Sequence, residues 1–513
     1  MTRPRHKAIL IFFIAICAVF SASADDDTDA LTHQHWYEAR TQHFNLYSCG
    51  PTQEVYKAIA RLEQFRDAYG LLAGAQVLTS PPITVIAFPD HASMRPFLPQ
   101  YQGQAESLSG FFKRSSDENL IVLELAGTNS ESLDTVYHEF THLLLRRNDD
   151  IWPVWLEEGM AEIYSTFEAA GRTVRFGKPI EHHLWILHHE PLMPLKDLLA
   201  VTHTSPQYNE QSYQGMFYAE SWLLTHYLMN GDNPIIKARF RDYTPLLRRG
   251  QSTIEAFTNA LRLPLPAIEA DFHRYLERGR FDPVIAPVSM DLSAPRQVAT
   301  RPIGRVETCF RLGDELLRIN RADAAEPFFA EAEKIAPNSP LPYEGLGMLA
   351  LQREHSDEAL RDLKTAVDKG STSFLAHYLY AETKFHAQGD GQGRYTRLDP
   401  TIATEIHNEL QRSIELMPTF GPSHELMGFF ELVQGDELAD AQQQLLRAIQ
   451  LEPENQWYLI SLAQVQLRSR DLDAARRTLE PLRLATTEPK LRERAEEEVT
   501  EIDRFQKRLN SGR

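Results

Sequence analysis

Cysteine is scarce in this chain of 513 residues, which contains three of them. Cys17 falls in a predicted leader segment, so Cys49 and Cys309 are the two that concern the folded protein. This number excludes a four-cysteine zinc knuckle. Cys49 and Cys309 could pair in an oxidising compartment, but they fall in different predicted domains, and we favour two unpaired thiols.

Positive charge is also in short supply. The chain has 53 Lys and Arg against 71 Asp and Glu, which gives a formal net charge of −18 and a pI near 5.5. Proteins that bind nucleic acid need a basic surface, so this balance argues against that class. The acidic residues are dispersed, as on a solvated surface. The length is sufficient for two or three domains.

The one hydrophobic run near the N-terminus, Ala8–Phe20, is short for a membrane-spanning helix. Basic residues precede it and the small residues Ala22–Ala24 follow it. We therefore predict a signal peptide over residues 1–24, export across an inner membrane, and a periplasmic protein without stable membrane insertion. An uncleaved anchor is the alternative.

The most informative stretch is the run His-Glu-Phe-Thr-His at positions 138–142. It lies within Ser130–Arg147, whose apolar residues recur at helical spacing. His138 and His142 then project from one helix face, which is the geometry of two ligands for one zinc ion. Glu139 lies about 100° around the axis, where it can contact a water on the metal without binding the metal. Two incidental histidines on an amphipathic helix are the alternative.

A catalytic zinc site needs a third protein ligand and an open fourth position. A second helix is predicted to begin near Pro153, and it carries the adjacent acids Glu157 and Glu158. We predict Glu158 as the ligand because it shares a helix face with Glu162, which can accept the second N–H of a ligand histidine. Glu157 is predicted to point aside into solvent.

These motifs resemble the gluzincin clan of zinc metallopeptidases. Two stretches show the resemblance. They are the His-Glu-x-x-His run and Trp155–Glu162, which reads Trp-Leu-Glu-Glu-Gly-Met-Ala-Glu. More narrowly, the chain resembles a poorly characterised bacterial group of peptidase-like domains in which a Tyr-Ala-x-Ser-Trp helix follows, here Tyr218–Trp222. The resemblance extends from Trp36 to about Arg280. It implies an α+β zincin-like domain, in which a small mixed sheet accompanies the helices.

The resemblance also implies a peptidase with one Zn²⁺, held by His138, His142 and Glu158, and with Glu139 as the general base. Tyr218 is a candidate hydrogen-bond donor to the oxyanion, although its helix could instead belong to the core. Fifteen residues separate His142 from Glu158, fewer than in the aminopeptidases of the clan, and no exopeptidase amine-binding motif is present. We therefore do not predict the substrate preference of those aminopeptidases for this chain.

Strands and helices alternate before the zinc motif. We predict strands over His43–Cys49 and Ile83–Phe88, a helix over Val55–Leu72, and a hairpin over Gly110–Lys113 and Leu120–Leu125. An edge strand of such a sheet can hold an extended peptide by main-chain hydrogen bonds. After the motif, four histidines cluster at positions 182, 183, 188 and 189. They could form a second metal site, but we favour polar histidines on a helix near the first.

The C-terminal part contains a repeat. A proline-punctuated stretch, residues 283–303, is predicted to be an interdomain linker. After it, Leu312-Gly313 and Ala325 recur 34 residues later as Leu346-Gly347 and Ala359. The pattern resembles the tetratricopeptide repeat (TPR), in which small residues let paired helices pack closely. We predict about five units over residues 304–485 and a capping helix over 486–513.

The predicted architecture is therefore a zincin-like domain over residues 25–282 followed by an all-α TPR solenoid. Such solenoids present a concave face to a protein or peptide. We predict a periplasmic zinc peptidase whose repeats recruit a substrate or partner protein. The alternative is an exported TPR scaffold with an inactive or structural zinc domain. Hydrolysis of a non-peptide amide or of cell-wall peptide is a third possibility.

Overall fold

The computed structural model describes residues 30–74, 83–101, 104–105, 108–126, 131–145, 152–209, 211–294, 296–390, 394–486 and 488–511. The predicted signal peptide lies outside the described residues. The chain divides into two compact units, the first made of residues 1–114 and 119–303, the second of residues 115–118 and 304–513. In the described residues, no helix combines the length and the apolar character needed to cross a bilayer.

The first unit is built on a six-stranded mixed sheet with the order β11-β1-β2-β3-β7-β6. Its strands are β1 (Tyr37–Arg40), β2 (Phe44–Ser48), β3 (Ile83–Phe88), β6 (Gly110–Arg114), β7 (Asn119–Glu124) and β11 (Ala299–Pro302). The central strands β2, β3 and β7 are parallel, and the outer strands pair antiparallel. All of β3 is buried, as expected for a strand covered on both faces. The strands and the hairpin that we predicted before the zinc motif are thus present.

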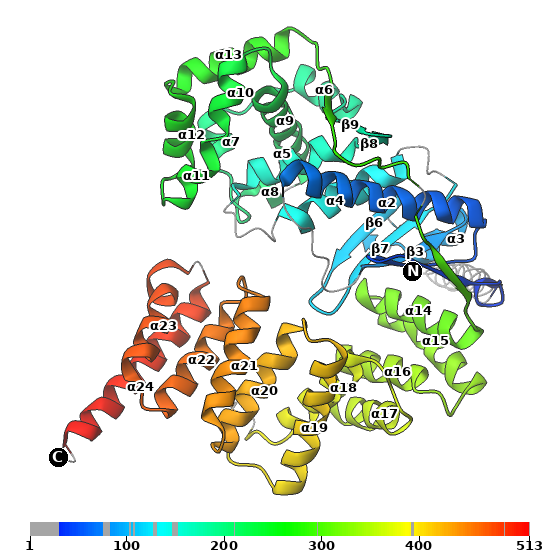
Figure 1. Cartoon of the computed structure of the whole chain (residues 1–513), viewed down its shortest axis with the longest axis vertical. Coiled ribbons are helices and arrows are strands. Elements are labelled where there is room, and N and C mark those ends of the chain that lie inside the picture. The colour runs from blue at the N-terminus through cyan, green and yellow to red at the C-terminus, as the bar shows by residue number, and fades with distance from the viewer. Residues whose placement is uncertain are drawn as a thin grey trace, which may run out of the picture. The chain divides into compact units, whose positions relative to one another are not determined.

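Two helices cover one face of this sheet, α2 (Thr52–Ala73) and α4 (Glu131–Leu145) (Figure 1). Alternate residues of β3, Ile83 and Val85 among them, point toward these helices and join their core. Phe65 on α2 stacks on Tyr137 on α4, with ring centroids 4.5 Å apart. This packing fixes the face that α4 turns away from the sheet, where the zinc motif lies.

Helices make up most of the rest of the first unit. The elements are α3 (His91–Met94), η1 (Arg95–Phe97), β4 (Gln100–Tyr101), β5 (Gln104–Ala105), α5 (Val154–Ser165), β8 (Glu168–Ala170), β9 (Thr173–Phe176), α6 (Glu181–His189), α7 (Leu195–Ala200), α8 (Pro206–Asn209), α9 (Gln211–Asn230), α10 (Pro234–Phe240), α11 (Tyr243–Arg248), α12 (Thr253–Leu261), α13 (Leu265–Glu277) and β10 (Val284–Pro287). The buried helix α9, which carries the Tyr-Ala-x-Ser-Trp motif, packs along α5.

The stretch 283–303 is not a simple linker, and that prediction was wrong for Val284–Pro287 and Ala299–Pro302, which form strands. β10 pairs with β9, and β11 adds an edge strand to the main sheet beside β1. Arg301 on β11 makes an ion pair of 2.6 Å with Glu38 on β1. Pro287 and Pro302 are at strand ends, where the missing N–H does little harm. The partners of both strands lie more than a hundred residues earlier, so no local periodicity marks them.

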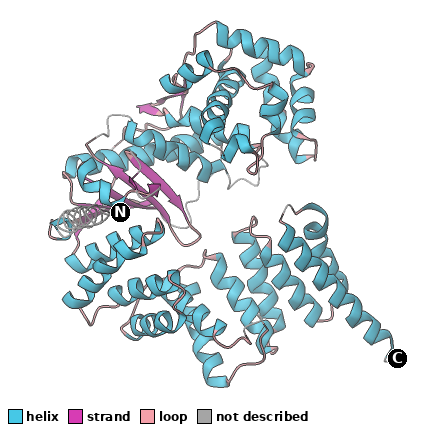
Figure 2. Ribbon diagram, turned by 180° about the vertical axis from the view of Figure 1, so that it is seen from behind, coloured by secondary structure: helices cyan, strands magenta, loops and turns pink. Residues whose placement is uncertain are grey.

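The second unit is a TPR-like solenoid of helix pairs. Its helices are α14 (Arg305–Arg318), α15 (Ala322–Ile335), α16 (Leu341–Gln352), α17 (Ser356–Asp368), α18 (Phe374–His386), α19 (Pro400–Leu416), α20 (Gly421–Gln434), α21 (Leu438–Leu451), α22 (Trp457–Arg468), α23 (Leu472–Ala485) and α24 (Pro489–Ser511). Each of the five pairs packs internally and against the next pair. Figure 2 shows this unit as helices, while the drawn strands belong to the first.

The repeated small residues explain the close packing of each pair. A Cβ at Gly347 on α16 would lie 2.6 Å from Leu363 on α17, and one at Gly428 on α20 would lie 2.7 Å from Leu445 on α21. Larger side chains at these positions would push the two helices apart. The final helix, α24, buries Leu491, Ala495 and Ile502 against the last pair.

Candidate metal centre

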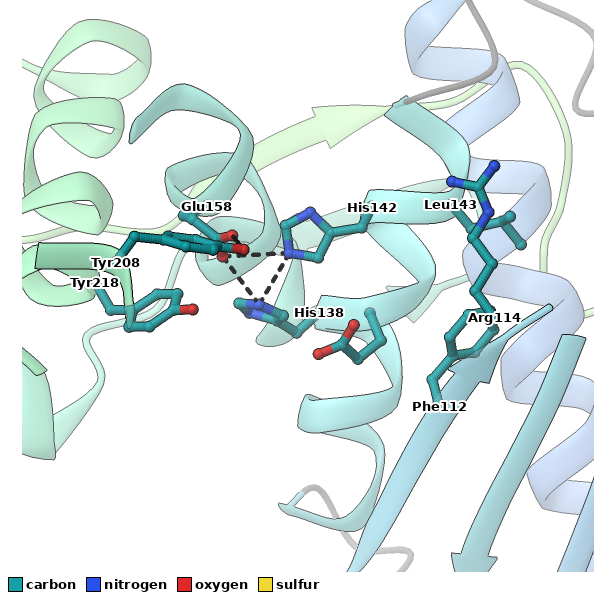
Figure 3. Close-up of a pocket in the computed structure, with 9 residues that line it drawn as sticks. Phe112, Arg114, His138, His142, Leu143, Glu158, Tyr208 and Tyr218 are labelled. Carbon is teal, nitrogen blue, oxygen red and sulfur yellow. Dashed lines mark hydrogen bonds and ion pairs between the residues drawn. The ribbon is translucent and has the colours of Figure 1, made fainter. Parts of the chain in front are cut away.

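The candidate site lies between α4 and α5, which pack against each other. The core face of α4 carries buried residues such as Val136, Phe140 and Leu144. The opposite face carries His138 and His142, one turn apart. From α5, Glu158 extends toward both imidazoles and is only 2% exposed. Figure 3 shows these three side chains converging from the two helices.

The three predicted ligands form a nearly equilateral triangle. The Nε2 atoms of His138 and His142 are 3.2 Å apart. Oε2 of Glu158 lies 3.4 Å from Nε2 of His138 and 3.2 Å from Nε2 of His142. Among the described residues, this is the one group of three or more His, Cys, Asp or Glu side chains arranged to share a metal ion.

The triangle has the dimensions of a zinc site. Zinc binds imidazole nitrogen and carboxylate oxygen at about 2.0–2.2 Å, so the ligand atoms on one edge of a tetrahedron are about 3.4 Å apart. Oε2 of Glu158 is buried, and its close polar neighbours among the described residues are the Nε2 atoms of His138 and His142. A buried carboxylate needs a compensating positive charge, which protons on these rings or a cation between the three atoms can supply. The donor set and the spacing therefore fit one Zn²⁺.

Each candidate ligand histidine has a carboxylate at its other ring nitrogen. Nδ1 of His138 lies 3.5 Å from Glu162, and Nδ1 of His142 lies 3.2 Å from Glu157. An Nδ1–H that donates to a carboxylate leaves the lone pair of Nε2 available for the metal. The two carboxylates thus set the tautomer and the orientation of both rings.

The prediction that Glu157 is solvated was wrong. Glu157 is 4% exposed and contacts His142. Position on α5 alone could not reveal this, because His142 lies one turn beyond His138 along α4 and meets a different part of α5. Adjacent residues of α5 consequently serve different purposes, with Glu158 facing the ligand triangle and Glu157 facing the outer nitrogen of one ligand.

One member of the histidine cluster belongs to this site. His183 on α6 is buried, and its Nε2 lies 3.0 Å from the Oε2 of Glu162, whose other oxygen faces His138. His182, His188 and His189 are exposed, and none of the cluster joins a second metal group in the described part of the chain. Sequence spacing did not distinguish His183 from its neighbours, since its partner lies on another helix.

Carboxylates determine the electrostatics of the triangle. Burial would lower the pKa of His142, but its contacts with Glu157 and Glu158 outweigh burial and raise that pKa to about 10. Burial likewise opposes a charge on Glu158, yet both histidines lower its pKa to about 2. Without a metal, the cluster therefore retains protons on its imidazoles. A divalent cation would displace those protons and would be attracted by the same carboxylates.

A pocket of about 170 Å³ opens onto the triangle. Glu139, the predicted base, lines it together with the three candidate ligands. Tyr208 and Tyr218 line it on one side, as Figure 3 shows. The hydroxyl of Tyr208 donates a hydrogen bond of 3.2 Å to Oε1 of Glu158. Sequence reasoning missed Tyr208, which lies on the short helix α8, 50 residues after Glu158.

Tyr218 lies close to the triangle, since its ring centroid is 6.3 Å from that of His138. Burial raises the pKa of Tyr218, and the charges of Glu158 and Glu139 act in the same direction. The phenol therefore keeps its proton and can donate a hydrogen bond into the pocket. Its neighbours Phe217 and Ala219 are fully buried, so the helix contributes to the core as well.

Replacing Glu157 with alanine is expected to weaken zinc binding about 10- to 100-fold, because His142 loses the acceptor that orients its ring. Glu157→Gln, which keeps one acceptor oxygen, should fall between the parent and Glu157→Ala. The measurement is competition for zinc against a chelating dye. Glu190→Ala, an exposed acid at the end of α6, is the matched control. Parental zinc affinity in Glu157→Ala would show that the contact between Glu157 and His142 does not contribute to zinc binding.

No protein-family model and no curated protein matches this chain. Several solved structures are similar to part of it. A thermophilic TPR protein from Thermus thermophilus has 23% identity and a TM-score of 0.28, over 38% of this chain and 99% of its own. YrrB, described as a TPR protein with an unusual peptide-binding site, has 15% identity and a TM-score of 0.31, over 37% of this chain and 90% of its own. Pseudomonas aeruginosa pilF has 15% identity and a TM-score of 0.29, over 40% of this chain and 93% of its own.

Proposed function

We propose that the first unit is a zinc-dependent peptidase and that the second unit recruits a substrate or partner protein. The observation that carries the proposal is the triangle of His138, His142 and Glu158 with Glu139 in the same pocket. Three protein ligands leave a fourth tetrahedral position open, which is typical of catalytic zinc, whereas structural zinc is normally closed by four protein ligands.

Zinc held here would supply Lewis-acid chemistry, polarising a carbonyl and lowering the pKa of water. The residues of the chain do the remaining work. Glu139 takes a proton from the attacking water and delivers it to the leaving amine. Tyr218 donates its hydroxyl hydrogen to the negative charge that develops on the carbonyl oxygen. Glu157 and Glu162 hold the two imidazoles in place during these transfers.

An extended peptide has a suitable place to bind beside this centre. β6 is the last strand of the six-stranded sheet, so within the described residues one of its backbone edges has no partner strand in that sheet. α4 packs on β6, and Phe112 and Arg114 of β6 line the pocket. A peptide added along that edge would lie next to Glu139 and the ligand triangle.

The repeats and the N-terminal segment complete the proposal. A TPR-like solenoid offers an extended surface for binding a protein or peptide. We propose that residues 1–24 are a signal peptide and that the periplasm is the place of action. After its export, the enzyme would meet its partner in the periplasm.

A scaffold is the second candidate function. The second unit contains five helix pairs followed by α24, and such a solenoid can assemble partners without any catalysis. The zinc domain would then be inert. The open fourth position and the presence of Glu139 favour the enzyme over this alternative.

Metal removal separates the two candidates. The full chain is expected to bind one zinc ion, to cleave members of a random peptide library, and to stop cleaving after treatment with a chelator. Added zinc should restore cleavage. Zinc content is measured by elemental mass spectrometry and cleavage by mass spectrometry of the digest. A protein without zinc, or a zinc-bound protein that cleaves no peptide, would favour the scaffold.

A further inference from the structure

One wall of the catalytic pocket has no part in the mechanism above. It is formed by Phe112 and Arg114 from β6 and by Leu143 from α4. In Figure 3 these three side chains lie on one side of the ligand triangle, and Tyr208 and Tyr218 lie on the other. The pocket therefore has a catalytic side with two hydroxyl groups and a second side with a ring, an aliphatic chain and a cation.

The strand geometry explains why Phe112 and Arg114 share this wall. Successive side chains of a strand point to opposite faces, so residues two apart lie on the same face. Phe112 is half-buried and Arg114 is exposed. Lys113, between them, is also exposed but does not line the pocket. The strand thus presents an apolar and a cationic side chain to the pocket, and a second cation elsewhere.

Charge distinguishes Arg114 from the other described residues that line the pocket. His138, His142 and Glu158 form the ligand triangle, and Glu139 is the proposed base. Arg114 is the one permanent cation of this lining. Its planar guanidinium matches a carboxylate, to which it can donate two parallel hydrogen bonds.

We infer that Arg114 makes this site selective for peptides that carry an acidic side chain close to the cleaved bond. The inference rests on the proposed peptidase function and names its substrate class. Side chains on the same side of an extended peptide are two residues apart, about 7 Å. A peptide lying along β6 therefore offers an acidic residue to Arg114 and, two positions away, an apolar residue to Phe112 and Leu143.

The test compares peptide-library digests of the parent, Arg114→Glu and the matched control Lys113→Glu, which changes the charge by the same amount on the neighbouring residue. In the parent, Asp and Glu should be enriched about tenfold over Lys and Arg at one position near the cleaved bond. Arg114→Glu should lose or reverse that enrichment, and Lys113→Glu should retain it. A parent without acidic preference, or equal effects of the two substitutions, would overturn the inference.

A binding measurement keeps this test independent of turnover. Two fluorescent peptides with the acid-x-Phe spacing, one with Glu and one with Lys at the acidic position, are titrated against the Glu139→Gln variant and against Glu139→Gln combined with Arg114→Glu. The Glu peptide should bind about tenfold more tightly to the first protein and lose that advantage in the second. If binding follows this pattern while the parent cleaves nothing, the selectivity stands and the peptidase proposal fails. Equal binding of both peptides to the first protein overturns the selectivity.

Discussion

Replacing Glu139 with glutamine is expected to lower the rate of peptide cleavage about 10²- to 10⁴-fold while one zinc ion stays bound. Glutamine has nearly the shape of glutamate but cannot accept a proton from the attacking water. Glu139 is not one of the three side chains that form the ligand triangle. The proton transfer should therefore fail without loss of the metal.

Two measurements on the same preparation decide this prediction. Zinc content per chain reports on the metal site, and kcat on a peptide found in the library digest reports on the chemistry. Parental kcat in Glu139→Gln would show that another group moves the proton. Loss of zinc would show that Glu139 acts as a ligand, which contradicts the role derived from its position on α4.

Replacing Gly159 with alanine should displace the neighbouring Glu158 and so distort the candidate metal site. Gly159 follows the candidate ligand Glu158 on α5, at the contact with α9. A Cβ there would lie 2.0 Å from Oγ1 of Thr225 and 2.4 Å from the backbone oxygen of Ser221. The hydroxyl of a side chain can rotate away, but the backbone of a buried helix cannot. α5 and α9 must therefore separate, and Glu158 moves with α5.

Two effects of this substitution oppose each other. Alanine favours a helix over glycine by about 1 kcal/mol. Forcing an extra carbon into a packed interior costs up to about 3 kcal/mol. We therefore expect the free energy of unfolding of the first unit to fall by up to about 2 kcal/mol, with weaker zinc binding because the ligand triangle is distorted. Denaturant unfolding and zinc titration measure the two effects.

Gly215→Ala provides a matched control for Gly159→Ala. Gly215 is also a helical glycine of the first unit, on α9, and a Cβ there would meet only the end of the Ile186 side chain, at 3.1 Å. A terminal methyl group can shift by a few tenths of an ångström at little cost. This variant should keep parental zinc affinity and should not lose stability, because the helix preference of alanine, about 1 kcal/mol, meets little steric cost here. Equal behaviour of the two variants would mean that close packing at Gly159 is unimportant.

Helical periodicity explains which parts of the site could be predicted. The four-residue spacing of His138 and His142 places them on one face of any α-helix, whatever surrounds it. The same spacing relates Glu158 to Glu162 on the next helix. The structure brings all four side chains to one place, and the choice of Glu158 over Glu157 for the triangle agrees with its geometry.

The repeats were predictable for a similar reason. A TPR-like unit packs against its sequence neighbours, so its close contacts recur at a fixed separation along the chain. Gly347 and Gly428 occupy equivalent positions because each must lie against a leucine of the following helix. The spacing of the small residues therefore follows directly from the packing of neighbouring helices.

The sequence by itself determined the helix faces of the His-Glu-x-x-His motif, the strands β2, β3, β6 and β7 of the sheet, and the helix pairs of the solenoid. Only the tertiary structure decided the burial of Glu157, the role of His183, the position of Tyr208 and Arg114 around the pocket, and the return of residues 284–302 to the first unit. The physical reason is the range of the contacts. Short-range contacts impose a fixed spacing that is visible in the sequence, whereas contacts between distant segments depend on how whole helices and strands pack, and no spacing records them.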